Sequence, residues 1–291
     1  MTRRDRPSRP SSLLGVIAGL WLLAGCAMSG STAAPPQQRE LRMATFNLYH
    51  DKADWPARRP LVIEQLRELD ADVVALQEVI QKPGVRNQAE DLGEALGYRV
   101  YFVSIDPPGR NQRYGNALLT RLPVLARDWK ALQPSSDSRS AGLVRVEFHG
   151  QPMNAYFTHL HYRDTPEGAA IRERQVEDLL GFIDATRGDA PSIVMGDLNA
   201  TSDSAELARL DGRFDSSFDV LHPGANDDAR HTTLNPRFFP DDQRRIDHIH
   251  VERGTFTVVS SRVALDRPGP DGTLPSDHFG LFSVLRLEPV P

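Results

Sequence analysis

Short apolar or alternating segments recur along most of the chain, and many of them end in a polar residue. Alternation of apolar and polar residues indicates a half-buried strand, and a short apolar run indicates a strand buried on both faces. We therefore expect strands near residues 41–46, 72–76, 98–103, 115–121, 124–129, 142–148, 156–161, 192–197, 244–250, 257–265 and 281–287. Apolar residues at helical spacing predict helices near residues 56–70, 88–96 and 167–186, and residues 201–243 are expected to be rich in loops.

The stretch at residues 192–199 joins a buried strand to an unusual polar end, Gly-Asp-Leu-Asn. Because side chains alternate along a strand, Asp197 and Asn199 are expected on one side and Leu198 on the other. A carboxylate can hold a proton or a cation, and a carboxamide can both donate and accept hydrogen bonds. An ordinary strand end with an Asx turn has the same sequence, so this stretch by itself leaves both interpretations open.

Two more polar strand ends flank the first predicted helix. Asn47 follows the strand near 41–46, and Glu78 follows the strand near 72–76. A strand–helix–strand unit favours neighbouring strands that run in the same direction, so the two side chains are expected to lie together. A solvated glutamate and a turn asparagine would look the same, and the pair gains weight only beside similar strand ends.

Later strands end in the same way. His159 and His161 alternate and are expected on one side of their strand, as parts of a site or by chance. The polar strand ends together are Asn47, Glu78, His159, Asp197, Asn199, Asp247, Asp277 and His278. Such an oxygen-rich set suits Mg²⁺ or Mn²⁺ better than Zn²⁺. Carboxylates and imidazoles without a serine or cysteine nucleophile fit metal-assisted attack of water on phosphorus.

Composition limits the class of protein. The chain has 291 residues, of which 40% are apolar and 25% charged, and it carries a formal charge of −5. Without its first 25 residues the chain has 30 basic against 38 acidic residues, or −8. An acidic body argues against non-specific coating of nucleic acid, which depends on Lys and Arg, but it allows a nuclease with a local basic cleft.

Residues 1–25 are predicted to be a lipoprotein signal peptide. Four arginines precede an apolar run at residues 13–24, which is too short to span a bilayer. The run ends in Leu-Ala-Gly-Cys, which resembles the bacterial lipobox, although an ordinary secretory cleavage site is the alternative. Cys26, the single cysteine, would carry the lipid, and residues 26–39 would form a flexible tether. We expect anchoring in the cell envelope, facing the periplasm or exterior, with the outer membrane preferred because the residue after Cys26 is not acidic.

The ordered motifs of residues 41–287 resemble the endonuclease/exonuclease/phosphatase superfamily, also called deoxyribonuclease I-like. They are Phe-Asn47, Leu-Gln-Glu78, Gly-Asn116-Ala, Thr-His159-Leu, Gly-Asp197-Leu-Asn199, Arg-Ile-Asp247-His and Ser-Asp277-His278. The resemblance implies an α+β fold, a four-layer α/β/β/α sandwich in which two mixed sheets pack face to face between helices. It implies one catalytic domain over residues 40–291, a monomer.

The resemblance also implies roles for the polar strand ends. Glu78 matches the principal metal ligand, with Asn47 beside it and Asp277 as a ligand of the same or a second ion. Asp197 and Asn199 match the pair that positions, and could deprotonate, the attacking water.

Three further positions complete the implied catalytic group. His278 matches the histidine that binds phosphate or handles the proton, and Asp247 matches its carboxylate partner. His159 matches a second histidine, for which the sequence shows no carboxylate partner. Tyr114, Asn116 and Arg121 are expected near substrate, with a structural ion pair as the alternative for Arg121.

The chemistry predicted from these features is hydrolysis of a phosphoester with Mg²⁺ or Mn²⁺, of the phosphodiesterase or nuclease type. The substrate would be nucleic acid or a phospholipid head group. The alternatives are a lipid hydrolase of the sphingomyelinase or phosphoinositide-phosphatase type, and a surface-binding module that has lost its chemistry.

Overall fold

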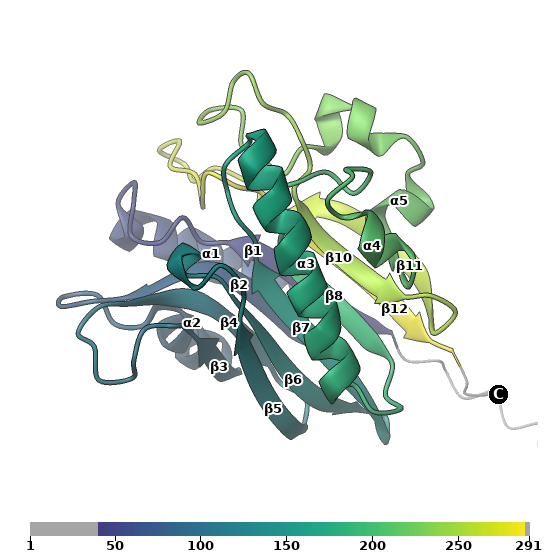
Figure 1. Cartoon of the computed structure of the whole chain (residues 1–291). Coiled ribbons are helices and arrows are strands. Elements are labelled where there is room, and N and C mark those ends of the chain that lie inside the picture. The colour runs from purple at the N-terminus through teal and green to yellow at the C-terminus, as the bar shows by residue number, and fades with distance from the viewer. Residues whose placement is uncertain (1–39, 289–291) are drawn as a thin grey trace, which may run out of the picture. The chain divides into compact units, whose positions relative to one another are not determined.

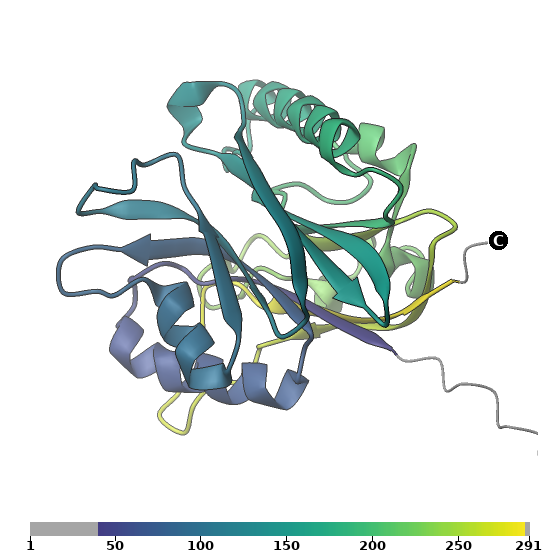
Figure 2. The same cartoon turned by 90° about the horizontal axis from the view of Figure 1, so that it is seen from below.

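The computed structural model describes residues 40–288 of the chain. They form two six-stranded β-sheets packed face to face, with helices on both outer faces (Figures 1 and 2). The predicted four-layer α/β/β/α sandwich is therefore confirmed. No helix among residues 40–288 combines the length and apolar character needed to cross a membrane. The predicted signal peptide (1–25), Cys26 and the tether (26–39) lie outside the described residues.

The first sheet contains the first predicted strand–helix–strand unit. Its strand order is β11-β12-β1-β2-β4-β3, and only β1 and β2 pair in parallel. Helices α1 (Trp55–Leu69) and α2 (Gln88–Leu96) cover its outer face. The strands are β1 (Leu41–Asn47), β2 (Val73–Gln81), β3 (Arg99–Val103), β4 (Arg113–Thr120), β11 (Phe256–Ala264) and β12 (Gly280–Leu287).

The second sheet has the order β5-β6-β7-β8-β10-β9, with β7 and β8 as its one parallel pair. Helix α3 (Pro166–Thr186) packs across its outer face. The strands are β5 (Val124–Ala131), β6 (Ser140–Phe148), β7 (Gln151–His159), β8 (Ser192–Asp197), β9 (Phe214–Ser216) and β10 (Asp247–Glu252). The short helices are α4 (Ala208–Asp211), α5 (Ser217–Leu221), η1 (Ser135–Asp137), η2 (Ala225–Asp227) and η3 (Ala229–His231).

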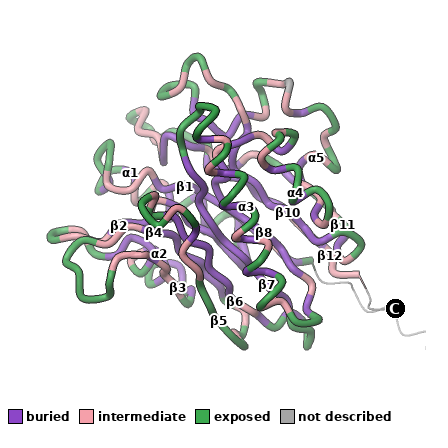
Figure 3. Tube along the Cα trace, viewed as in Figure 1, coloured by how far each residue is buried: buried purple, intermediate pink, exposed green. Residues whose placement is uncertain are grey.

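Apolar side chains from both sheets form the central core, and the buried strands fill the middle of Figure 3. Strand alternation explains this division, because one set of side chains faces the other sheet and the next set faces the helices. In β1, Met43 belongs to the core between the sheets, whereas Ala44 and Phe46 pack under α1 and α2. Each sheet is therefore buried on both faces near its centre, as its apolar strands predicted.

The predicted end of β2 at Glu78 is wrong. The strand continues to Gln81, and its pairing with β4 shifts register between Leu76 and Val79. Glu78 lies in this β-bulge with a φ of 56°, a left-handed conformation that a non-glycine residue adopts at a cost. A bulge redirects the side chain without ending the strand, and the alternation rule does not anticipate it.

Two histidines are buried on the outer face of β10. Ile249 and Val251 face the core between the sheets, so His248 and His250 face the helical side. His248 Nε2 lies 2.9 Å from the Ala200 carbonyl oxygen, and neither ring nitrogen of His250 has a hydrogen-bond partner in the described part of the chain. Burial lowers the pKa of both imidazoles, that of His250 to about 4 despite the nearby Asp219 carboxylate.

We predict that His250→Leu makes the fold less sensitive to acid. As the pH falls from 6.5 toward 4, the His250 imidazole takes up a proton in the unfolded chain, where its pKa is near 6.5, but stays neutral in the folded protein. Protonation therefore favours the unfolded state, and His250 lowers the free energy of unfolding over this pH range. A shift of this size corresponds to about 3 kcal/mol. Urea unfolding at pH 7.5 and 4.5 should show a smaller loss of stability in the variant than in the wild type. Equal losses would contradict the prediction.

Candidate active site

A cavity of about 480 Å³ opens where the ends of strands from both sheets meet. Seven of the eight predicted polar strand ends line it. The eighth, Asp247, does not line the cavity but is hydrogen-bonded to His278. The lining residues are Asn47, Glu78, Tyr114, Asp137, Arg139, His159, Tyr162, Asp197, Asn199, Leu234, Phe239, Asp242, Arg244, Ile246, Asp277 and His278.

Gly196 allows β8 to bring Asp197 into this cavity. Its φ is +146°, and a Cβ atom there would lie 2.0 Å from the Thr158 carbonyl oxygen of the neighbouring strand β7. Only glycine fits such close contact between two strands. In the parallel pairing of β7 with β8, His159 is then opposite Asp197.

The Gly-Asp-Leu-Asn stretch forms the expected Asx turn, and its two polar residues line the cavity. Asp197 Oδ1 accepts a hydrogen bond of 2.9 Å from the Asn199 backbone N–H, which is an Asx turn. Asn199 adopts a φ of 53°, and its Nδ2 donates to the Leu160 carbonyl oxygen at 3.0 Å. Asp197 and Asn199 thus line the same cavity through the turn, while Leu198 packs in the outer core.

The Asp197 carboxylate is the centre of the polar network. Its Oδ2 accepts from Asn47 Nδ2 at 3.0 Å, and lies 3.4 Å from His159 Nε2 and 3.9 Å from His278 Nε2. Burial and then the neighbouring Asp247 carboxylate raise the pKa of Asp197 to about 7, against the opposing positive charge of His278. A carboxylate with a pKa near neutrality is suited to general-base chemistry.

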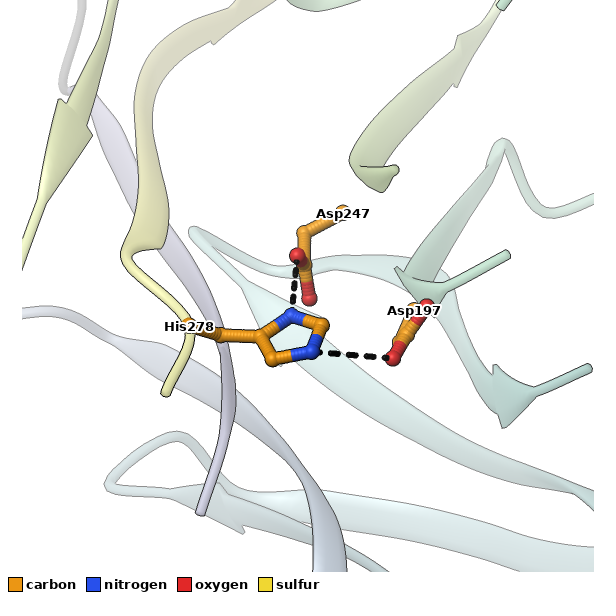
Figure 4. Close-up of side chains that lie close together, drawn as sticks. All are labelled: Asp197, Asp247 and His278. Carbon is orange, nitrogen blue, oxygen red and sulfur yellow. Dashed lines mark hydrogen bonds and ion pairs between the residues drawn. The ribbon is translucent and has the colours of Figure 1, made fainter. Parts of the chain in front are cut away.

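His278 and Asp247 form a buried hydrogen-bonded pair, drawn in Figure 4. His278 Nδ1 lies 2.9 Å from Asp247 Oδ2, and Nε2 points to Asp197. Burial alone would lower the pKa of His278, but the carboxylates of Asp247, Asp197 and Asp277 outweigh it and raise the pKa. The imidazole is therefore a cation at neutral pH, held in one orientation by Asp247.

His159 has the opposite electrostatic environment. Burial first, then the positive charges of Arg139 and His278, lower its pKa well below the usual value. Its Nδ1 has no hydrogen-bond partner among residues 40–288, and the carboxylate beside its Nε2 is Asp197. His159 is thus a neutral imidazole that shares the carboxylate of the central network.

Glu78, Asp277 and Asn47 also line the cavity and carry side-chain oxygen atoms. Burial raises the pKa of Asp277 to about 6. The positive charge of His278 opposes this rise, and repulsion from the Glu78 carboxylate adds to it. Two carboxylates that repel each other in a buried site fit a hard divalent cation, whose charge would offset both. One possible ligand atom from each of Asp197, Asp247 and His278 also lies within 4.8 Å of the other two, but the hydrogen bond from His278 to Asp247 makes that group a poorer metal site.

The structure separates the three predicted substrate contacts. Tyr114 lines the cavity beside Glu78 and Arg139, and burial followed by the Glu78 charge raises its pKa. Asn116 is buried and donates to the Ser140 carbonyl oxygen at 3.2 Å, so it supports the start of β6. For Arg121 the structure shows the expected alternative, a structural ion pair: it pairs with Asp70 and covers the Tyr98 ring at the opposite end of β4, away from the cavity.

Arg139 is a candidate functional residue that the sequence patterns missed. It follows η1, lines the cavity, and is only 8% exposed, yet its Nε has no hydrogen-bond partner among the described residues. The Asp137 carboxylate lies 3.9 Å away, beyond hydrogen-bond distance. A buried guanidinium with an unused donor is suited to an anionic group such as a phosphate. A loop arginine carries no periodic signal, so only the folded loop reveals it.

Known proteins are similar to this chain in sequence and in architecture. The profile of the Endonuclease/Exonuclease/phosphatase family matches residues 44–278. Nocturnin of Drosophila melanogaster is 23% identical over 332 aligned residues, which cover 94% of this chain and 51% of that protein. The chain therefore spans about half the length of this curated relative.

Solved structures repeat the same fold. The human Nocturnin catalytic domain with bound sulfate superposes with a TM-score of 0.69 and 22% identity, covering 88% of this chain and 100% of that one. TDP2 of D. rerio, complexed with a single-strand DNA product, gives a TM-score of 0.70 at 19% identity, with 85% and 99% covered. An endonuclease/exonuclease/phosphatase from Beutenbergia cavernae gives 0.69 at 22% identity, with 87% and 73% covered.

We predict that Arg139→Met weakens the binding of inorganic phosphate. A charge-assisted hydrogen bond contributes about 1.5–3 kcal/mol, which corresponds to roughly 10- to 100-fold in affinity. Phosphate should raise the melting temperature of the wild type and raise that of the variant less. Arg121→Met removes an arginine far from the cavity and should keep the full phosphate effect. Equal phosphate responses of the Arg139 variant and the wild type would contradict this role.

Proposed function

The chain belongs to the endonuclease/exonuclease/phosphatase family, whose members hydrolyse phosphoester bonds, and from this premise we propose that it is a metal-dependent phosphodiesterase of the nuclease type. One observation supports the proposal above all others. A buried carboxylate with a pKa near 7, Asp197, lies between a cationic and a neutral histidine in one cavity. Groups with pKa values pushed apart in this way are typical of acid–base sites.

Glu78, Asp277 and Asn47 would hold the metal ion. Glu78 and Asp277 supply carboxylate oxygens, and Asn47 Oδ1 keeps one lone pair beyond the hydrogen bond that it accepts from the Tyr49 N–H at 2.9 Å. A bound Mg²⁺ or Mn²⁺ would supply positive charge that neutralises the phosphoester and stabilises its transition state. The donor set matches the preference of these ions for oxygen.

Asp197 and Asn199 would prepare the attacking water. Asp197 accepts the proton, and its raised pKa keeps it a useful base near neutral pH. The Asn199 Nδ2 is used by the Leu160 carbonyl, so the Oδ1 atom remains to accept a hydrogen bond from the water. The Asn47 Nδ2 donor fixes the base by its hydrogen bond to Asp197 Oδ2.

Two positive side chains would bind the phosphate oxygens. His278 is kept protonated and oriented by Asp247, and Arg139 offers an unused Nε–H. His159, being neutral, can donate from one ring nitrogen and accept at the other. Donors that are already in place cost no reorganisation as charge develops on the phosphate.

Assays of phosphoester hydrolysis test the proposal directly. The purified chain is given supercoiled DNA, RNA, bis-p-nitrophenyl phosphate, sphingomyelin and an inositol polyphosphate, with Mg²⁺, Mn²⁺ or EDTA. We expect metal-dependent cleavage of the first three classes. Cleavage of sphingomyelin or the inositol polyphosphate alone would support the lipid-hydrolase alternative. No cleavage, together with no metal binding, would support a binding module.

We predict that His278→Ala lowers kcat on the cleaved substrate by about 10²- to 10³-fold, because it removes a positive side chain that donates to the phosphate oxygens. Asp247→Asn should lower kcat in the same direction, because it removes the charge that keeps His278 protonated. His222→Ala is the matched control, since His222 Nε2 donates to the Ser261 carbonyl oxygen at 3.0 Å and His222 does not line the cavity. Full activity of His278→Ala, with the fold intact, would exclude the assigned role.

We further propose that a lipid on Cys26 holds this domain at the cell envelope, facing the periplasm or exterior. The support is the lipobox-like sequence and the single cysteine. Fractionation of cells expressing the full chain should find it in the membrane fraction, with the outer membrane preferred. Cys26→Ser should move it to the soluble fraction, and an unchanged distribution would exclude the lipid anchor.

A further inference from the structure

Arg58 in helix α1 is a buried cation whose hydrogen bonds in the described structure all go to backbone carbonyls. The residue is 1% exposed. Its Nη1 donates to Leu48 at 2.8 Å and to Pro275 at 2.7 Å, and its Nε donates to Lys52 at 2.9 Å. Its Nη2 donates to His50 at 2.8 Å and to Tyr49 at 3.3 Å. Buried arginines usually pair with a carboxylate, so this all-carbonyl arrangement calls for an explanation.

The five carbonyls belong to two segments that each carry a candidate metal ligand. Leu48 directly follows Asn47, and Pro275 lies two residues before Asp277. A single nitrogen, Arg58 Nη1, bridges the carbonyls of Leu48 and Pro275. The guanidinium therefore fixes the end of β1 relative to the loop that leads into β12.

The segment after Asn47 needs an external support of this kind. Tyr49 and His50 have φ values of 56° and 30°, which place two non-glycine residues in the left-handed region. Such a conformation persists only when surrounding contacts favour it, and Arg58 binds the carbonyls of both residues. The planar guanidinium also lies over the rings of Tyr49 and Trp55, at 5.7 and 5.3 Å.

Two neutral side chains add further hydrogen bonds between the segments that carry the candidate metal ligands. Ser276 Oγ donates to the Asn47 carbonyl at 2.7 Å. Gln88 Nε2 donates to the His50 carbonyl at 2.7 Å, while its Oε1 accepts from the Ile80 N–H at 3.0 Å, two residues after Glu78. The segments that carry Asn47, Glu78 and Asp277 are thus connected through one hydrogen-bonded unit with Arg58 at its centre.

We propose that Arg58 is a positioning residue that sets the separation of Asn47 and Asp277, and through it the affinity of the cavity for a divalent cation. The proposal rests on the metal-assisted function proposed above. A guanidinium presents five N–H donors in a fixed plane, whereas the ammonium of a lysine has three donors on one atom and cannot reach all five carbonyls. Outer residues that hold metal ligands typically change metal affinity 10- to 100-fold when replaced.

Titration calorimetry with Mn²⁺ on the full chain tests the proposal without any substrate. Arg58→Lys should bind Mn²⁺ roughly 10- to 100-fold more weakly than the wild type. The matched control is Arg145→Lys, because Arg145 also donates to carbonyls, those of Thr186 and Arg187, at the opposite end of β8. The control should lose stability without losing Mn²⁺ affinity. Wild-type affinity in Arg58→Lys would overturn the proposal.

Chemical rescue separates positioning from general stability. Arg58→Ala leaves a space that a free guanidinium ion can fill, so low, non-denaturing guanidinium chloride should restore part of the Mn²⁺ affinity. Equal concentrations of urea, which lacks the charge, and of NaCl, which lacks the shape, should not restore it. Rescue by urea or NaCl to the same degree would show that Arg58 has no specific role.

Hydrogen exchange on the wild type keeps the test decisive if an Arg58 variant fails to fold. Mn²⁺ should slow amide exchange in residues 48–52 and 275–278 together, because Arg58 couples the two segments. Slowing in residues 275–278 alone would overturn the coupling. A wild type that binds Mn²⁺ as described but cleaves no phosphoester would refute the proposed function and leave the role of Arg58 in place.

Discussion

The hydrogen bond of 3.0 Å from Asn47 to Asp197 joins the two sheets at the point where the chemistry gathers. Asn47 ends β1 of the first sheet, and Asp197 ends β8 of the second. Each of these strands belongs to the one parallel pair of its sheet, so each pair delivers two strand ends to the same edge. The cavity exists because the face-to-face packing of the sheets brings these edges together.

Burial gives two histidines in the same cavity different protonation states. His159 and His278 line one cavity, but carboxylates surround His278 while Arg139 and a second imidazole oppose the charge of His159. In water both rings would titrate alike, whereas in a medium of low polarity the neighbouring charges decide which ring holds a proton. The same physics raises the pKa of Asp197 and Asp277, so the site depends on its exclusion from bulk water.

Several residues around this site have a strained backbone, and contacts with other residues hold them in place. Glu78 and Asn199 adopt positive φ values, and each such residue costs roughly 1 kcal/mol or more. The register shift in β2 holds Glu78, and the Asx turn from Asp197 holds Asn199. The carbonyl-bound guanidinium of Arg58 supports the strained segment that follows Asn47. Long-range contacts therefore hold Glu78 and the segment after Asn47, whereas a local turn holds Asn199.

The sequence by itself determined most of the strands, the three long helices and most of the polar positions near strand ends, because periodicity reports directly which side of an element is buried. It missed β9, which lies in the stretch expected to be rich in loops. Helix α2 was predicted at its observed bounds, and α1 and α3 within one residue at each end. Only the tertiary structure decided that Arg139 rather than Arg121 faces the cavity, that Glu78 lies in a bulge, and that His159 shares the carboxylate of Asp197. These features depend on contacts between residues distant in sequence and on loop conformation, and neither leaves a periodic pattern in the chain.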